Sequence, residues 1–181
     1  LDGADIFNMV PRSEIWENKC FLFSKWSYAM NAAAILMMWQ RYGQDIDFIN
    51  FNNMANTHSQ STIETPKEGA YPTAAGMIMH RFAHTRAYRT LVLEGYHPKR
   101  TDPVQVQLSM NANGDALVLN LLNRSEEDSE LELDLTAFPA EDGEAEGICL
   151  AADSLVSMNT LHERQIREFA AVLRVEKQMV K

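Results

Sequence analysis

The sequence predicts an α+β fold, in which a helical first part is followed by an antiparallel β part. Residues 24–42 are apolar on nearly every face of the helix that they would form, whereas from Tyr88 onward apolar residues recur with the period of two that is typical of strands. A helix that is apolar all round has to be buried by other elements. Because the chain offers few elements for this purpose, we expect it to be a fragment whose upstream segment is missing ahead of Leu1.

The composition excludes several classes of protein. The formal net charge of −9, without any cluster of lysine and arginine, argues against a nucleic-acid partner. Cys20 and Cys149 lie far apart and outside any CxxC motif, so we expect neither a disulfide framework nor a zinc site. The apolar run 26–39 is interrupted by Asn31 and is shorter than the roughly 20 residues that a bilayer requires, so we expect no membrane partner.

The first part is predicted to contain a helix, a tight turn, a strand and a second helix. The helix over 24–42 is expected to stop at Gly43, and Ile46–Asn50 has the β-branched and aromatic content of a short buried strand. This order is typical of an α/β barrel or a doubly wound sheet. A second helix is predicted from Pro72 to about His84. Its packing stripe is expected to consist of Met77, Ile78, Met79 and Phe82.

The segment 52–72, between the predicted strand and the second helix, is the best candidate for a functional site. It is rich in polar and turn-forming residues, and it is too long for a routine connection. Loops that follow strands are also where α/β folds commonly carry their function.

The second part predicts antiparallel strands, and a small β-sandwich is the expected outcome. The strands are expected at 89–96, 104–110, 116–125, 129–138 and 144–152, with a turn at Asn113-Gly114. Alternate leucines of 129–138 are expected to face the core, while the carboxylates between them face water. The end of the chain leaves two alternatives open, because 169–175 has helical spacing but could also form a final strand.

The order of these segments resembles the C-terminal part of the family 51 α-L-arabinofuranosidases. The resemblance rests on the Ala/Met-rich helix, the strand leading into NFNNMAN, the helix start at Tyr71-Pro72, DALVLNLLNRS followed by ELELDLTAF, and LVSMNTLHE. These segments stand in the family's order and cover most of residues 24–163. After Glu163 the chain departs from the family, which normally continues through further strands.

This resemblance implies an α+β fragment with two parts. Residues 1–85 would be the C-terminal end of a catalytic (β/α)8 barrel, with its last helix, strand and helix units. Residues 86–181 would be a C-terminal, jelly-roll-like antiparallel β-sandwich that is not necessarily complete. The implied activity is retaining hydrolysis by two glutamates held about 5 Å apart. In the family both glutamates precede the helix at 24–42, so they are expected upstream of Leu1, and the chain alone is expected to be inactive.

No residue of this chain is therefore expected to be catalytic. Glu14 and Glu17 do not end a strand, which is where a barrel places its catalytic groups. A role as general acid could be considered for each of Glu64, Glu68 and Glu94. The favoured interpretation is that each is an exposed carboxylate of a loop or strand.

A pair of histidines raises a metal hypothesis. His80 and His84 are four residues apart on one predicted helix face and could chelate an ion together. Because no third ligand is evident, a structural or surface pair is the favoured interpretation. We expect no metal and no cofactor.

The resemblance also implies a substrate contact after the predicted strand. The family has a sugar-binding glutamine where this chain has Asn53, and an asparagine that matches Asn56. Asn53 is one methylene shorter than glutamine, which preserves the amide but reduces its reach. The alternative for these residues, and for the neighbouring Asn52, is that they bond their own backbone in turns. Trp16 is a further candidate for a sugar contact.

Three hypotheses follow for function and partners. The chain is the C-terminal portion of an arabinofuranosidase-like enzyme that acts on arabinose-containing oligo- or polysaccharides of plants. Alternatively, it is a non-catalytic carbohydrate-binding or scaffolding β-sandwich. In the third hypothesis it completes its barrel with a partner chain, or covers its apolar helix as a homo-oligomer. Two cellular locations, cytoplasmic and secreted, remain as alternatives, because the location depends on the missing N-terminus.

Overall fold

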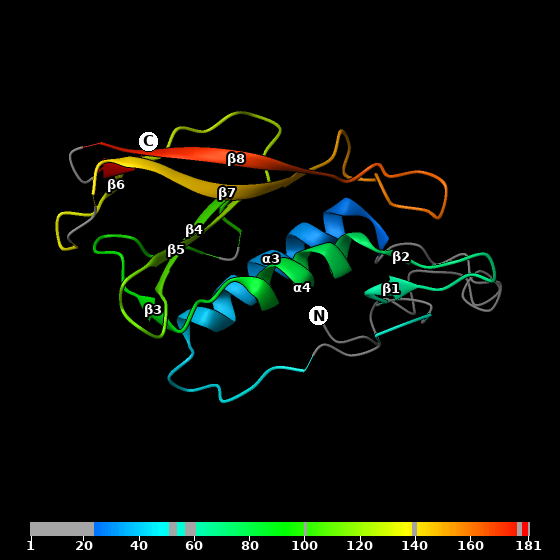
Figure 1. The fold of residues 1–181 in the computed structure, drawn as a ribbon, viewed down its shortest axis with the longest axis horizontal. Helices are drawn as coiled ribbons and strands as arrows, with labels where there is room; N and C mark the ends of the chain where they lie inside the picture. The colour runs from blue at the N-terminus through cyan, green and yellow to red at the C-terminus, as the bar shows by residue number, and fades with distance from the viewer. Residues whose placement is uncertain are drawn as a thin grey trace.

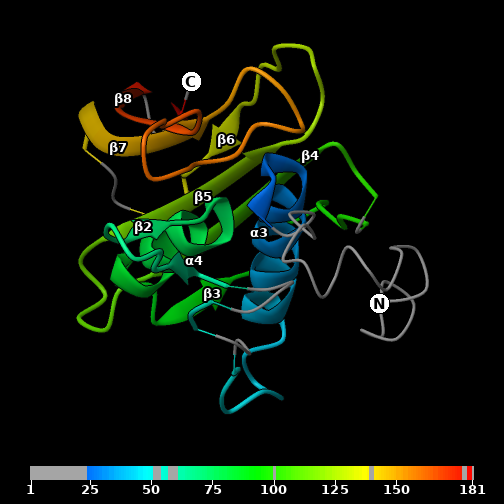
Figure 2. The same cartoon turned by 90° about the vertical axis from the view of Figure 1, so that its right-hand side faces the viewer.

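The computed structural model describes residues 24–50, 54–56, 61–99, 101–138, 141–176 and 179–180, and their elements form three layers. Two helices, α3 (Trp26–Arg41) and α4 (Ala74–His84), lie side by side in the first layer (Figure 1). A three-stranded sheet packs against the helices, and a four-stranded sheet covers its other face (Figure 2). The structure therefore has the α+β composition that the sequence predicts.

Helix α3 corresponds closely to the helix predicted over 24–42. No side chain caps its first turn; instead, the backbone N–H of Trp26 donates to the carbonyl oxygen of Ser157 at 2.8 Å. The helix ends at Arg41. In the turn that follows, the N–H of Gly43 donates a hydrogen bond to the carbonyl oxygen of Gln40 at 3.2 Å. In the part of the chain that the structure describes, no helix is long and apolar enough to cross a membrane.

Helix α4 confirms the second predicted helix, with a different first turn. Thr73 is its N-cap, and the hydroxyl oxygen of Thr73 accepts the backbone N–H of Gly76 at 3.1 Å. Pro72 lies just ahead of this cap, not in the first helical turn as predicted. The predicted packing stripe is confirmed at Met77, Ile78 and Phe82.

The three-stranded sheet has the order β3–β4–β5, and both of its pairings are antiparallel. Its strands are β3 (Arg89–Leu91), β4 (Val104–Met110) and β5 (Leu117–Asn123). The predicted turn at Asn113-Gly114 joins β4 to β5. Gly114 has a φ of 77°, a left-handed conformation that glycine adopts without steric cost.

The four-stranded sheet has the order β6–β9–β8–β7 and is also antiparallel. Its strands are β6 (Leu133–Asp134), β7 (Gly143–Ala151), β8 (Arg167–Glu176) and β9 (Met179–Val180). Strand β8 settles the alternative for the end of the chain in favour of a strand. Leu133 and Leu135 are buried while Asp134 is exposed, which confirms the predicted alternation.

Two hydrophobic cores hold the layers together. The first lies around the helices, and it includes Leu122 of β5 and Ile166 from the turn before β8. The second lies between the sheets, where Val106 and Leu108 of β4 pack with Leu133 of β6. Residues from both sides of the predicted boundary at 85 therefore share the first core.

Polar contacts also join α3 to the three-stranded sheet. The guanidinium of Arg41 donates to the carbonyl of Val106 at 3.1 Å, and the hydroxyl of Thr90 donates to the carbonyl of Gln40 at 2.7 Å. Burial lowers the pKa of Arg41 from its ordinary value. These bonds orient the C-terminal end of α3 on the sheet.

The prediction of a buried strand at Ile46–Asn50 is wrong for this structure. The segment forms no strand and pairs with none of the strands among the described residues. Phe48 is 76% exposed and Ile49 is 39% exposed. Composition of this kind favours a strand only where a neighbouring strand supplies hydrogen bonds and apolar cover, and among the described residues no strand supplies either to this segment.

Candidate functional site

The polar segment between the two helices folds into a loop around two short paired strands, β1 (Ile63–Glu64) and β2 (Tyr71–Pro72). Residues 54–56 run beside β1, where Ala55 forms a parallel bridge with Ile63. The backbone N–H of Ile63 donates to the carbonyl of Met54 at 3.1 Å. The chain that follows the predicted strand is thereby held near the start of α4.

Asn56 is the predicted sugar-binding residue that the structure describes. Its φ of 52° is left-handed, a conformation that asparagine tolerates better than most residues. Its side-chain oxygen accepts the backbone N–H of Thr65 at 2.7 Å, and its side-chain nitrogen donates to the hydroxyl of Thr65. The amide therefore closes its own loop, in agreement with the alternative of a turn-forming asparagine.

The amide of Asn56 keeps further hydrogen-bonding capacity. An asparagine side chain offers two donors and an oxygen with two lone pairs, and the bonds to Thr65 use one donor and one lone pair. Asn56 is exposed, and in the described part of the chain no other group bonds to the remaining donor and lone pair. Its structural role and a substrate contact are thus compatible.

Thr73 anchors this loop to the helical layer. Its side chain is 1% exposed, and its hydroxyl donates to the carbonyl of Ser61 at 2.7 Å. The backbone N–H of Thr73 donates to the carbonyl of Thr62 at 3.0 Å. Gly76 permits this approach, because a Cβ at Gly76 would lie 1.9 Å from the carbonyl oxygen of Thr62. The start of α4 and the candidate site form one packed unit.

Asn159 connects the candidate loop to the residue that precedes β8. It is 1% exposed; its amide nitrogen donates to the carbonyl of Pro72 at 3.3 Å, and its amide oxygen accepts the N–H of Ile166 at 3.0 Å. Asn159 lies in the segment LVSMNTLHE, which contributed to the family resemblance. In this structure its role is to join two segments that are distant in the sequence.

Glu64 and Tyr71 are the titratable residues of the β1–β2 pair, where they lie opposite each other. Burial raises the pKa of the Tyr71 phenol, and the negative charge of Glu64 raises this pKa further. Tyr71, which lies opposite Glu64, thus offers a phenol and not a second carboxylate. The pair does not provide the two carboxylates that retaining hydrolysis requires.

Several predicted residues lie outside the described ranges. These are Asn53, Asn52, Trp16, Glu14 and Glu17. Of the other carboxylates considered, Glu68 and Glu94 are exposed, as expected.

The histidine pair is present on α4. The ring centroids of His80 and His84 are 4.1 Å apart, and Nδ1 of His84 lies 2.8 Å from the carbonyl oxygen of His80. Within the described ranges, no three or more His, Cys, Asp or Glu side chains lie together in a group that could hold a metal ion. The contact to its own helix backbone supports a structural interpretation of His84.

The structural roles of two residues that organise this region, Thr73 and Asn159, were not predicted from the sequence. Thr73 could have been found from its position ahead of an apolar helical stripe, which is typical of an N-cap. Asn159 gave no such signal, because its partners lie 87 and 7 residues away in the sequence.

Comparisons with known proteins give no assignment. No family model matches this sequence, and no curated protein matches it.

Proposed function

We propose that this chain is the C-terminal portion of an α-L-arabinofuranosidase-like retaining glycoside hydrolase, whose two catalytic glutamates lie upstream of Leu1. The substrate would be an arabinose-containing oligo- or polysaccharide. In this proposal the helices and the segment between them belong to the end of a (β/α)8 barrel, and the sheets form the C-terminal β-sandwich.

The exposed segment Ile46–Asn50 is the observation that carries the proposal. It has the composition of a buried strand and lies between two helices in the sequence, yet Phe48 is 76% exposed and the segment has no partner strand among the described residues. A barrel strand without its neighbours would have these properties, because neighbouring strands supply both the hydrogen bonds and the apolar cover. The upstream part of the enzyme would supply these strands.

The position of Asn56 supports a role in substrate binding. Active sites of barrel enzymes are built from the loops that follow the strands, and Asn56 lies in the loop that follows this segment. Thr65 fixes the side chain of Asn56, so the remaining amide groups are held in one orientation. A positioned amide of this kind suits the recognition of sugar hydroxyl groups.

A partner chain is the second candidate source of the missing strands. The same exposed segment favours it, because a separate subunit could also cover Phe48. The carbohydrate-binding alternative would depend on exposed aromatic side chains on one sheet face. Tyr88 is 78% exposed and Phe169 is 49% exposed, but Tyr88 precedes β3 whereas Phe169 lies on β8 of the other sheet.

Turnover of 4-nitrophenyl α-L-arabinofuranoside tests the proposal. We expect activity in the product of the whole native gene and none in the 181-residue chain. Activity that appears only when a second gene product is added would support the partner-chain alternative. Turnover by the 181-residue chain itself would contradict the proposal.

Variants of the active protein test the site. Asn53→Gln restores the family's residue and is expected to retain or improve kcat/KM. Asn56→Ala is expected to lower kcat/KM by about tenfold, the effect of losing one or two hydrogen bonds to substrate. Thr65→Val is the matched control, because it removes the hydroxyl that supports the amide of Asn56 without removing the amide itself. Because alanine at position 56 also strains the left-handed backbone, the deciding comparison uses Asn56→Gly, which tolerates the φ of 52°. A smaller loss in Thr65→Val than in Asn56→Gly would indicate a direct substrate contact.

A further inference from the structure

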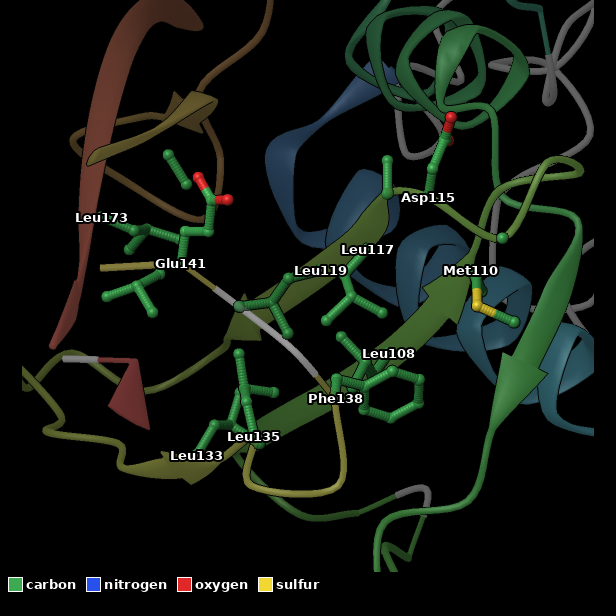
Figure 3. A pocket seen from close by; sticks show the side chains of 14 residues that line it. Leu108, Met110, Asp115, Leu117, Leu119, Leu133, Leu135, Phe138, Glu141 and Leu173 are labelled. Atoms are coloured by element: carbon green, nitrogen blue, oxygen red, sulfur yellow. The ribbon is translucent and has the colours of Figure 1, made fainter. Parts of the chain in front are cut away.

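A cavity of about 500 Å³ lies between the two sheets. Its walls come from β4 and β5 on one side and from the region of β6, β7 and β8 on the other. Figure 3 shows leucine side chains from both sides directed into the same space, together with Phe138. Pockets for small molecules in proteins commonly have volumes of roughly 300 to 1,000 Å³.

The cavity has a buried floor and an exposed mouth. Leu108, Leu133 and Leu135 line the floor and are 4%, 9% and 5% exposed. Asp115 and Glu141, which also line it, are exposed. A small molecule could therefore enter between the β4–β5 turn and the start of β7, and bury an apolar body against the leucines.

The charges around the cavity restrict the chemistry of its ligand. Among the described residues, those that line the cavity include two carboxylates, Asp115 and Glu141, and no lysine, arginine or histidine. Asp115 accepts a hydrogen bond from the side chain of Asn111 at 2.6 Å, which ties it to the turn. The carboxylate of Glu141 has no hydrogen-bond partner among the described residues, so it is available to a cationic group at the mouth. A negatively charged ligand would be repelled.

We propose that the intersheet cavity binds an apolar small molecule that is neutral or carries one cationic group, such as an alkylamine. The apolar body of the ligand fills the space between the sheets and makes van der Waals contacts with the side chains that line it. The cationic group lies at the mouth near Glu141. This site is on the opposite face of the three-stranded sheet from the helices. The inference does not depend on the proposed glycosidase function.

Fluorescence of the neutral probe N-phenyl-1-naphthylamine tests the proposal on the 181-residue chain. We expect a saturable rise in emission on titration, and displacement of the probe by dodecyltrimethylammonium and dodecanoate at concentrations below their micelle thresholds. The cation should displace the probe at a concentration about threefold lower than the carboxylate, and Glu141→Gln should reduce this difference.

Two variants with a matched control locate the binding. Leu119→Trp places a larger side chain in the cavity, whereas Leu121→Trp makes the same change on the same strand at a side chain that is 49% exposed and outside the cavity lining. We expect probe binding to be lost in Leu119→Trp and retained in Leu121→Trp. Ala145→Leu, at the exposed mouth, is expected to weaken binding without changing the buried floor.

The proposal is overturned by any of three results. The first is the absence of saturable probe binding to the folded wild-type chain. The second is equal binding by Leu121→Trp and the two cavity variants. The third is tighter displacement by dodecanoate than by the cation. If Leu119→Trp does not fold, Ala145→Leu carries the same comparison with the control.

Discussion

At the scale of single residues, the side chain of Asn159 is predicted to stabilise the fold. Its buried amide donates a hydrogen bond to the carbonyl of Pro72 and accepts one from the N–H of Ile166. Asn159→Ala would leave both backbone groups without this partner, which we expect to lower the free energy of unfolding by about 1–3 kcal/mol. Urea denaturation measures the change. The exposed Asn113→Ala is the control, with an expected change within about 0.5 kcal/mol; equal losses in both variants would contradict this role.

Asn56 allows its side-chain bonds to be separated from its backbone conformation. Asn56→Gly removes the bonds to Thr65 but tolerates the φ of 52°, whereas Asn56→Ala removes the bonds and adds about 1 kcal/mol of left-handed strain. We therefore expect hydrogen exchange of the Thr65 amide to be slowest in the wild type, faster in Asn56→Gly and fastest in Asn56→Ala. Faster exchange in the glycine variant than in the alanine variant would refute the left-handed assignment.

Cys149 gives a prediction of pH dependence. Its thiol is free and half-buried, and burial raises its pKa. The thiolate is the reactive form, so at any pH below the raised pKa the folded protein contains less of it than an unfolded chain does. In a Cys20→Ser background, we expect iodoacetamide to react with Cys149 more slowly in the folded protein than in urea. The difference should shrink as the pH rises through the raised pKa; equal rates near pH 8 would show that the thiol is not protected.

At the scale of elements, Gly76 tests how α4 packs on the candidate loop. Alanine is favoured over glycine inside a helix by about 1 kcal/mol, so propensity alone predicts that Gly76→Ala stabilises the protein. The new Cβ would instead lie 1.9 Å from the carbonyl oxygen of Thr62, so we expect a net loss of stability. Gly147→Ala is the matched control, because its nearest contact would be an ordinary 3.5 Å. Thermal unfolding should show a lower midpoint for Gly76→Ala only.

The elements also show what sequence reasoning could and could not predict. β4 was predicted at its observed bounds, because strict alternation and the following Asn-Gly turn are local signals. The strand predicted at Ile46–Asn50 is not observed, because a strand depends on neighbours that local sequence does not specify. The antiparallel sheets of the second half were predicted, but the packing of helices and sheet around one shared core was not.

The candidate site was predicted less completely than the fold. The loop between the helices was found from its length and composition, and Asn56 lies within it. The bonds from Asn56 to Thr65 were not predicted, because they require a left-handed residue and a loop that returns on itself. The contribution of Asn53 to substrate binding remains a prediction.

At the scale of the whole molecule, exposed apolar residues after α3 predict self-association of the isolated chain. Tyr42, Phe48 and Met54 are 58%, 76% and 75% exposed. Sedimentation velocity of the 181-residue chain should show association that rises with concentration, and Phe48→Glu should reduce it. Tyr88→Glu is the control, because Tyr88 is equally exposed, at 78%, but lies at the start of the second half. Association that responds equally to both substitutions would contradict a specific role for this segment.

The proposed function places both catalytic glutamates upstream of Leu1. Its most direct test is to trap the covalent glycosyl-enzyme in the product of the whole native gene with a mechanism-based arabinofuranosyl inhibitor, and to locate the label by peptide mass spectrometry. A retaining mechanism predicts one labelled glutamate. Under the proposed function this glutamate precedes Leu1. A label on any residue of the 181-residue chain, or no label at all, would contradict it.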